Sequence, residues 1–386
     1  MRVLITVGFL GHYGETDGVV TTYRNLIPHL VRWGEHVDLV AYGPEDRIET
    51  DGRVRRITHR PRLPVRVDPA RWVDGAFALT PLARELARRP YDLVQSSTPD
   101  PMGLWARAVA RRHGAPFLAL YHTALAEYAA IRGTRAAGPV IGDLMRRVMD
   151  GALRRYYDSA DLVLCPSESV RSELATTLHV PIEVLSRGVD SETFRPDPKR
   201  VPPTRPRALY VGRVAPEKNL DLLAHVFAAP APADLTIVGD GPAREGLEQR
   251  LPNAVFTGRL GGPALARAYA DADFFVFPSR TDTLGNVVLE AMAAGLPAVV
   301  TDSMGPKELL RDGVTGFVAR SDDGFAAAVH SLATHADRRR AMGAAARAFA
   351  ETRSWDTIFN RLVGVYGRLL AARAARAPEV LHAARA

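Results

Sequence analysis

Short apolar runs alternate with longer amphipathic stretches along nearly the whole chain. The runs span four to eight residues and are rich in β-branched and aromatic side chains, whereas the stretches between them place apolar residues at helical spacing. This alternation is typical of βα units on a parallel sheet. It predicts an α/β protein with two such sheets, one in each half of the chain. The predicted strands are Val3 to Phe9, Val37 to Tyr42, Leu93 to Ser97, Phe117 to Tyr121, Leu162 to Pro166 and Ile182 to Leu185, then Ala208 to Val211, Leu235 to Val238, Ala254 to Thr257, Phe274 to Pro278, Ala298 to Thr301 and Gly316 to Ala319.

The segment between the two series of strands is rich in proline. Residues 195–207 contain five prolines, which fix backbone angles and remove hydrogen-bond donors. We therefore predict an interdomain linker at 195–207, between a first domain at 1–194 and a second at 208–354. A last helix begins near Trp355, and its apolar face, recurring every three or four residues, predicts that residues 355–386 dock back on the first domain.

The composition excludes several classes of protein. Of 386 residues, 47% are hydrophobic and 24% charged, which is typical of a globular protein rather than a disordered one. No apolar run is long enough to cross a bilayer, and the start of the chain reads as a strand rather than as a secretory signal. A single cysteine, Cys165, excludes an internal disulfide framework and favours a cytoplasmic location.

The net charge of +7 arises almost entirely from arginine, since only three of the 50 basic residues are lysines. The arginines are scattered rather than clustered with stacking aromatics, so we expect no nucleic-acid partner. One group could still form a basic face for anionic lipid headgroups, at the inner face of a membrane, although a solvated arginine-rich surface is the favoured interpretation. It comprises Arg146, Arg147, Arg154 and Arg155 on a helix predicted at Gly142 to Tyr157, with Arg53, Arg55, Arg56, Arg60, Arg62 and Arg66 upstream.

The segment from Phe277 to Pro297 carries the strongest chemical signal. It reads as a strand, a polar loop and a short helix that opens near Gly285 and Asn286. The positive end of a helix, next to a glycine that lets a ligand approach the backbone, is suited to phosphate. Asp282 precedes this position and Glu290 follows it, so two carboxylates flank the predicted phosphate site and could accept hydrogen bonds from sugar hydroxyls. A helix cap and a surface acid are the alternative roles for this pair.

A second segment, from Tyr210 to Asn219, supplies cations. A predicted strand runs into Gly212 and Arg213, and Lys218 follows five residues later. Both cations lie at the carboxyl end of a strand, where open α/β sheets bind ligands. Arginine offers a planar fork and lysine a point charge, so the pair is suited to a diphosphate.

These two segments resemble those of the retaining glycosyltransferases of the GT4 family, which have the GT-B fold of two Rossmann-like domains facing a cleft. The resemblance is carried also by Gly188-Val189-Asp190, Phe194 and Gly239 to Pro242. It departs from the family pattern in Asp282, where the acid-x7-acid motif usually has glutamate, and in Leu284, where phenylalanine is usual. The sequence resembles the GDP-mannose-dependent mannosyltransferases and related hexosyltransferases of this family.

The resemblance implies roles for individual residues. Arg213 and Lys218 match cations on the donor diphosphate, Glu290 matches the ribose-binding acid, and Asp282 matches the acid that contacts the donor sugar. In the first domain, Gly18 matches a glycine loop at the cleft, and His122 matches a histidine near the transferred sugar. The remaining donor-binding positions implied are Arg259 and Leu260 at the base and Thr283, Leu284, Gly285, Asn286 and Val287 at the phosphates.

Other motifs point to structure rather than to chemistry. The run Gly239 to Arg244 lacks the third glycine of a dinucleotide fingerprint, which disfavours hydride transfer. Asp271 and Asp273 more naturally end a helix than bind metal, and Cys165 reads as a buried structural thiol. Lys307 matches a loop near the donor in the family. We expect no metal and no bound cofactor.

The sequence thus predicts a metal-independent hexosyltransferase. It would move a sugar from GDP-mannose or a UDP-hexose to a lipid, glycan or small-molecule acceptor, with retention of configuration implied by the family. Two alternatives stay open at this point: an epimerase acting on nucleotide sugars, and a scaffold that binds them without turnover. We expect variable loops of the first domain, such as Ala124 to Gly138, to read the acceptor.

Overall fold

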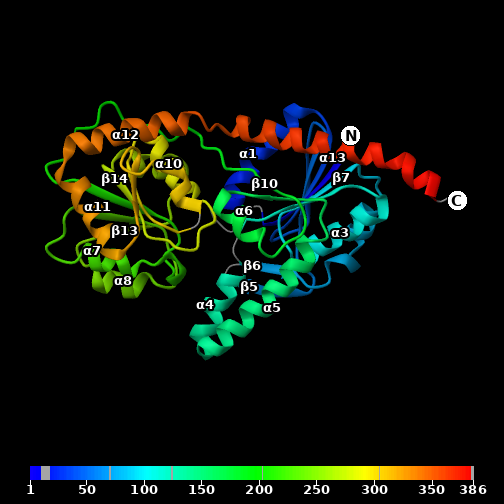
Figure 1. Cartoon of the computed structure of the whole chain (residues 1–386), viewed down its shortest axis with the longest axis horizontal. Coiled ribbons are helices and arrows are strands. Elements are labelled where there is room, and N and C mark those ends of the chain that lie inside the picture. The colour runs from blue at the N-terminus through cyan, green and yellow to red at the C-terminus, as the bar shows by residue number, and fades with distance from the viewer. Residues whose placement is uncertain (10–17, 69–70, 123–124, 202, 304, 384–386) are drawn as a thin grey trace. The chain divides into compact units, whose positions relative to one another are not determined.

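The computed structural model describes residues 1–9, 18–68, 71–122, 125–201, 203–303 and 305–383. The chain divides into two compact units (Figure 1). Unit 1 comprises Met1–Pro166, Arg171–Leu185 and Asp356–Ala386, and unit 2 comprises Ser167–Val170 and Ser186–Trp355. Both units are α/β, and the parallel sheets expected from the alternating pattern are present in each.

Unit 1 is built on an eight-stranded sheet with the order β10-β9-β8-β7-β1-β2-β4-β3. All neighbours are parallel except β3 and β4, which form an antiparallel pair at one edge. A separate two-stranded ribbon pairs β5 with β6. The strands are β1 (Arg2–Phe9), β2 (His36–Tyr42), β3 (Arg47–Asp51), β4 (Val54–His59), β5 (Pro64–Asp68), β6 (Arg71–Asp74), β7 (Leu93–Ser96), β8 (Phe117–Leu120), β9 (Leu162–Cys165) and β10 (Ile182–Val184).

The helices of unit 1 follow the predicted pattern with one major exception. Residues 125–137 form a helix, α4, where we expected a variable loop. Leu125, Ile131 and several alanines in this segment favour a helix, and Gly133 and Gly142 let it pack closely on α5. The helices are α1 (Gly18–Trp33), η1 (Phe77–Leu79), α2 (Pro81–Ala87), α3 (Pro101–His113), α4 (Leu125–Ala137), α5 (Pro139–Tyr157), α6 (Glu168–Leu174, whose first turn belongs to unit 2) and α13 (Trp355–Ala383).

The strands β3 to β6 were not predicted from the sequence. The arginine-rich stretch that we considered as part of a basic face instead forms β4 and the turns around it. Several of its arginines pair with acids of the same unit, including Arg55 with Asp38 and Arg56 with Glu49. Because acids of neighbouring strands balance these arginines, the stretch is not one continuous basic surface. Arginine alternating with apolar residues obscured the strand pattern.

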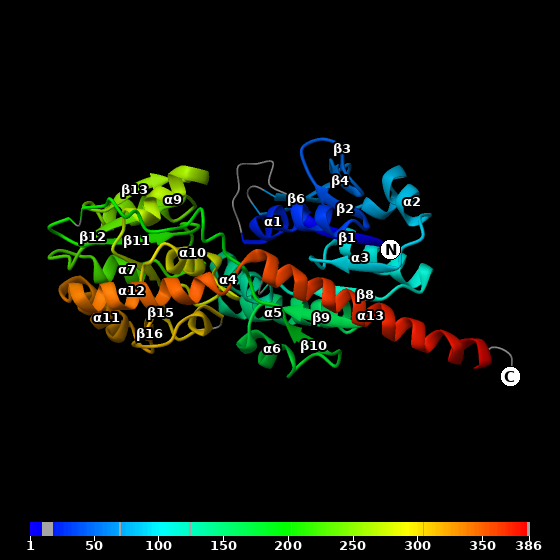
Figure 2. The same cartoon turned by 90° about the horizontal axis from the view of Figure 1, so that it is seen from above.

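The C-terminal helix α13 packs on unit 1, as its apolar face predicted (Figure 2). The Tyr366 hydroxyl donates to the Gln95 side-chain oxygen on β7 at 2.5 Å. At the start of the helix, the Asp356 carboxylate lies 3.2 Å from Nδ1 of His29 on α1. The helix therefore covers α1 and the middle of the sheet of unit 1.

Unit 2 has a six-stranded, fully parallel sheet with the order β13-β12-β11-β14-β15-β16. Strand order reverses between β11 and β14, which places a topological switch point at their carboxyl ends. The elements are β11 (Arg207–Val211), η2 (Pro216–Lys218), α7 (Asp221–Val226), β12 (Asp234–Val238), α8 (Arg244–Arg250), β13 (Val255–Gly258), α9 (Gly262–Ala270), β14 (Phe274–Phe277), α10 (Asn286–Ala293), β15 (Ala298–Thr301), η3 (Gly305–Leu309), β16 (Gly316–Ala319), α11 (Asp322–Thr334) and α12 (Ala336–Glu351).

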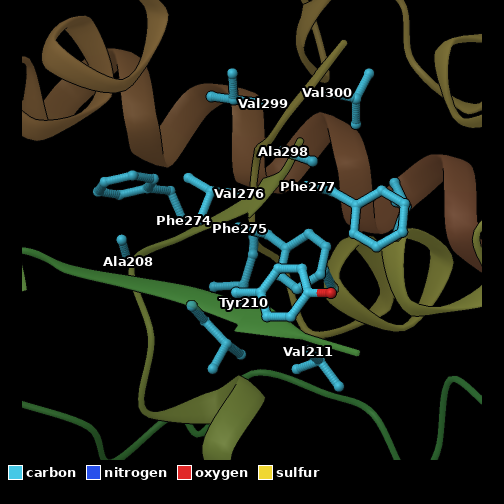
Figure 3. Packing of buried hydrophobic residues seen from close by; sticks show 14 of the residues in the cluster. Ala208, Tyr210, Val211, Phe274, Phe275, Val276, Phe277, Ala298, Val299 and Val300 are labelled. Atoms are coloured by element: carbon cyan, nitrogen blue, oxygen red, sulfur yellow. The ribbon is translucent and has the colours of Figure 1, made fainter. Parts of the chain in front are cut away.

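The core of unit 2 lies around the central strands β11, β14 and β15 (Figure 3). All four residues of Phe274–Phe277 are buried, because a parallel strand covered on both faces has no solvent side. The rings of Tyr210 and Phe277 stack with centroids 6.2 Å apart, and the Tyr210 hydroxyl donates to the Arg213 carbonyl at 3.0 Å. The core thus fixes the direction in which the chain leaves β11.

The proline-rich segment 195–207 falls within unit 2, together with the turn before it. Arg347 of α12 contributes to this placement, because its Nη1 group donates to the carbonyls of Ser191, Phe194 and Ala293 at 2.8, 2.9 and 2.6 Å. The domain boundaries that the sequence suggested stay predictions.

Candidate functional site

Hydrogen bonds join two loops at the carboxyl edge of the unit 2 sheet, one after β11 and one after β14. The Asn219 side-chain amide donates to the Pro278 carbonyl at 3.2 Å, and the Thr281 hydroxyl donates to the Glu217 carbonyl at 3.1 Å. Asn219 has a positive φ of 55°, a conformation that asparagine tolerates better than most residues. The two segments singled out in the sequence are therefore in direct contact, at the switch point of the sheet.

A bidentate ion pair joins these loops. Nζ of Lys218 donates to both carboxylate oxygens of Asp282, at 2.8 Å each, and the two side chains are only 13% and 20% exposed. Asp282 thus holds the lysine in one position and balances its charge. A carboxylate whose two oxygens both face an ammonium group is placed to orient that group for an incoming anion.

Arg213 lies beside this pair at the end of β11. Its guanidinium is 3.4 Å from the Glu217 carboxylate and is more exposed than Lys218, at 39%. The chain reaches it through Gly212, where a Cβ would lie 2.7 Å from the Tyr210 hydroxyl, so that only glycine fits without a shift. Arg213 is therefore a solvent-accessible cation next to a partly buried one.

The N-terminus of α10 faces the same edge. Gly285 precedes the helix with a φ of 83°, and a Cβ there would lie 3.3 Å from the Phe277 ring. On the other side of the loop, a Cβ on Gly305 would lie 1.9 Å from the Thr283 carbonyl oxygen, so η3 packs directly on the backbone of residues 283–284. Both glycines shape the loop that contains Asp282, the partner of Lys218, and that leads into the positive end of the eight-residue helix α10.

Glu290 lies one turn into α10 and is poorly solvated. The Tyr269 hydroxyl donates to its Oε2 at 2.8 Å, and burial raises the pKa of Glu290 to about 7, although that hydrogen bond opposes the rise. Tyr269 also lies 3.3 Å from the Val287 carbonyl oxygen. A carboxylate held in this way is suited to accept hydrogen bonds from vicinal hydroxyls, which would replace its missing water.

Sequence reasoning did not identify Tyr269 as part of the site. It lies on α9, a short apolar helix in which a tyrosine reads as a core residue. The sequence offered no signal for this contact, because the partner of a buried tyrosine hydroxyl is decided by the packing of α9 on α10. The Asn219 and Thr281 contacts were missed for a similar reason, since each depends on a backbone carbonyl of another loop.

The predicted base-binding residues lie at the neighbouring strand ends. Arg259 and Leu260 follow β13, and the Gly239 amide donates to the Gly258 carbonyl at 2.8 Å, which joins the ends of β12 and β13. Arg259 is exposed, and Leu260 packs partly against the core. Thr283, Leu284, Asn286 and Val287 lie in the loop and the first turn of α10, as expected.

Two predicted residues belong to unit 1. His122 follows β8 and is half-buried, and its ring meets that of Tyr23 edge to face at 6.2 Å between centroids. Gly18 is the first residue of α1. Asp17, which stands where the family's glycine loop has its first glycine, lies outside the described residues. Tyr23 accepts a hydrogen bond from the Gln95 amide at 2.9 Å, so the surroundings of His122 are part of the packed sheet.

Several side motifs have structural roles. Asp273 accepts hydrogen bonds from the Arg207 amide at 2.8 Å and from Arg200 at 3.0 Å, and Asp271 caps the end of α9, as expected from the sequence. Cys165 is buried, and Lys307 pairs with Asp302 at 2.8 Å. Over the described ranges, no cluster of three or more histidine, cysteine or acidic side chains could hold a metal ion.

Family models match both halves of the chain. Residues 16–193 match the model described as "Glycosyltransferase Family 4", and residues 205–335 match "Glycosyl transferases group 1". A "GDP-mannose-dependent alpha-mannosyltransferase" of Mycolicibacterium smegmatis is 35% identical over 98% of this chain and 100% of its own length. A "GDP-mannose-dependent alpha-(1-6)-phosphatidylinositol monomannoside mannosyltransferase" of Mycobacterium tuberculosis is 35% identical over 58% of this chain and 66% of its own.

The fold is shared with solved glycosyltransferases. A sucrose-phosphate synthase from Thermosynechococcus elongatus superposes with a TM-score of 0.77 at 20% identity, over 96% of this chain and 99% of that one. The GT-B fold and the family resemblance predicted from the sequence are confirmed, and nothing in these comparisons supports an epimerase. By its family matches and by its full-length similarity to a mannosyltransferase, the chain belongs to glycosyltransferase family 4, and it is an enzyme that transfers a sugar.

Proposed function

We propose that this glycosyltransferase takes a mannosyl group from GDP-mannose and transfers it, with retention of configuration, to a lipid-linked or glycan acceptor. The observation that supports the donor site is the Lys218–Asp282 ion pair, which joins the loop that carries Arg213 to the loop that precedes the positive end of α10. The choice of GDP-mannose is supported by the name of the relative that matches this chain over its full length. The relative named for a phosphatidylinositol acceptor supports a lipid-linked acceptor.

The chemistry needed at the site is stabilisation of a leaving diphosphate. As the bond between the sugar and the β-phosphate breaks, negative charge grows on the phosphate oxygen. Lys218, Arg213 and the amides of residues 284–287 would offset that charge from fixed positions, which is the most effective form of electrostatic catalysis. Glu290 would hold the ribose, and the departing phosphate oxygen would itself accept the proton of the acceptor hydroxyl.

The structure suggests that Asp282 acts on Lys218. In the family-based expectation, this acid contacts the donor sugar, but both of its oxygens face Nζ of Lys218. A sugar contact and a lysine clamp make different predictions for Asp282→Asn. Loss of a sugar contact would weaken GDP-mannose more than GDP, whereas loss of the clamp would weaken both ligands equally.

The test is calorimetric binding of GDP, UDP and GDP-mannose, combined with transfer of labelled mannose to extracted lipids. Lys218→Ala should weaken GDP binding about 30-fold, from loss of about 2 kcal/mol in a charge-assisted contact. Lys199→Ala is the matched control, because Lys199 is an exposed lysine of the same unit. Undiminished GDP binding by Lys218→Ala and Glu290→Ala would refute the site. Tighter binding of UDP than of GDP would refute the donor.

A further inference from the structure

Helix α5 exposes a stripe of large apolar side chains. Val140, Leu144 and Val148 are 78%, 55% and 66% exposed, and Ile141 and Met145 beside them are 38% and 41% exposed. Positions four residues apart lie on one face of a helix, so these side chains form a continuous strip. Of the fourteen large hydrophobic residues that the described part of the chain exposes, these five lie on a single helix.

Val140, Leu144 and Val148 lie on the side of α5 opposite Gly142, whereas Met145 lies at the edge of the α4 contact, since a Cβ on Gly133 would lie 2.7 Å from its sulfur. The opposite side of the helix packs on α4 through Gly142, where a Cβ would lie 2.7 Å from the Ala130 carbonyl oxygen, and further along it buries Leu153 and Tyr156. Figure 1 shows α4 and α5 as a hairpin that extends away from the sheet of unit 1. Among the described residues of unit 1, no element covers the apolar strip, and a large exposed apolar patch is unusual on a protein surface.

Arginines flank the strip. Arg147 is 75% exposed between Leu144 and Val148, and Arg155 continues the line of Val140, Leu144 and Val148 towards the end of the helix. Arg146 and Arg147 share the Asp143 carboxylate, and Arg146 also lies 3.9 Å from the Asp150 carboxylate, so these four side chains together are neutral. Residues 125–157 carry six arginines and three acids. An apolar strip bordered by arginine matches the surface of an anionic bilayer, which presents acyl chains beneath negative headgroups.

We propose that the exposed face of α5 (Val140, Ile141, Leu144, Met145, Val148, with Arg147 and Arg155) docks on an anionic phospholipid membrane. The helix would lie in the plane of the interface, because none of the described helices is long and apolar enough to span a bilayer. A second copy of the chain fits the face less well. A stable dimer buries about 800 Å² per partner, more than one strip of five side chains offers, and a symmetric contact would bring the arginines of both copies together.

The test is co-sedimentation of the full chain with vesicles, which requires no substrate. We expect binding to phosphatidylcholine vesicles that contain about one third phosphatidylglycerol, and weaker binding to phosphatidylcholine alone. Leu144→Ser combined with Val148→Ser should reduce binding at least about tenfold. Leu79→Ser combined with Val255→Ser is the matched control, because these residues are 69% and 58% exposed but lie elsewhere. Arg147→Gln with Arg155→Gln should abolish the preference for phosphatidylglycerol.

Three results would overturn the proposal. The wild-type chain could stay in the supernatant with anionic vesicles, the serine pair on α5 could bind them as well as the wild type, or that pair could convert a dimer to a monomer in vesicle-free sedimentation. The last result would identify the face as a contact between copies. Because GDP binding and thermal unfolding are measured on the same variants, loss of vesicle binding with GDP binding intact separates this proposal from the donor site.

Discussion

Replacing Glu290 by glutamine should stabilise the protein at high pH and weaken its donor binding at the same time. Burial raises the pKa of this carboxyl from 4.5 to about 7. The folded chain therefore holds the proton more tightly than the unfolded chain does. The stability that this provides is fully present below about pH 4.5 and is lost as the pH rises through 7. At pH 8, the wild type carries a buried charge that the glutamine variant does not.

The magnitude follows from the shift. Each pKa unit corresponds to 1.36 kcal/mol, so the full effect approaches about 3 kcal/mol, and most of it develops between pH 5 and pH 8. For a unit of this size, 1 kcal/mol moves the melting temperature by about 2 to 4 °C. We expect Glu290→Gln to melt within about 3 °C of the wild type at pH 5 and about 5 to 10 °C above it at pH 8.

Scanning calorimetry of both proteins across this pH range is the assay, with GDP titration as the functional readout. Glu245→Gln is the control, because Glu245 is an exposed acid of the same unit and the substitution changes the net charge equally. The reasoning fails if the difference between Glu290→Gln and wild type is the same at pH 5 and at pH 8. It fails also if the control reproduces the pH-dependent difference.

Three further substitutions test the scaffold of the site. Gly305→Ala should lower the free energy of unfolding by about 3 kcal/mol and weaken GDP binding, because its Cβ would collide with the Thr283 carbonyl. Urea unfolding measures the first effect and titration calorimetry the second. If neither changes, η3 does not shape the loop. Arg347→Ala should cost about 2 to 4 kcal/mol from three carbonyl contacts, whereas exposed Arg340→Ala should cost under about 1 kcal/mol in the same unfolding experiment. Gly142→Val should separate α4 from α5, so that limited proteolysis cleaves this helical hairpin first. Cleavage of the hairpin at the wild-type rate would contradict the close packing of α4 on α5.

The sequence by itself determined the class of fold and the elements that carry the proposed donor site. Alternating apolar and amphipathic stretches set the parallel sheets, because strands buried on both faces must be apolar throughout, as Phe274–Phe277 is. The carboxyl ends of such strands meet at one edge, so Lys218 and Glu290 could be assigned to one site before any contact was known. These features depend on the local pattern of apolar residues and on chain connectivity, and both can be read from the sequence.

Only the tertiary structure decided which groups touch. The Lys218 and Asp282 side chains are 64 residues apart in the sequence, and Tyr269 contacts Glu290 from another helix. Sequence spacing therefore predicts neither contact. The raised pKa of Glu290 depends on what surrounds the carboxyl, and the exposed strip on α5 became visible only once α4 was found to cover the other side. Burial and long-range contacts are properties of the packed chain, and a local pattern cannot specify them.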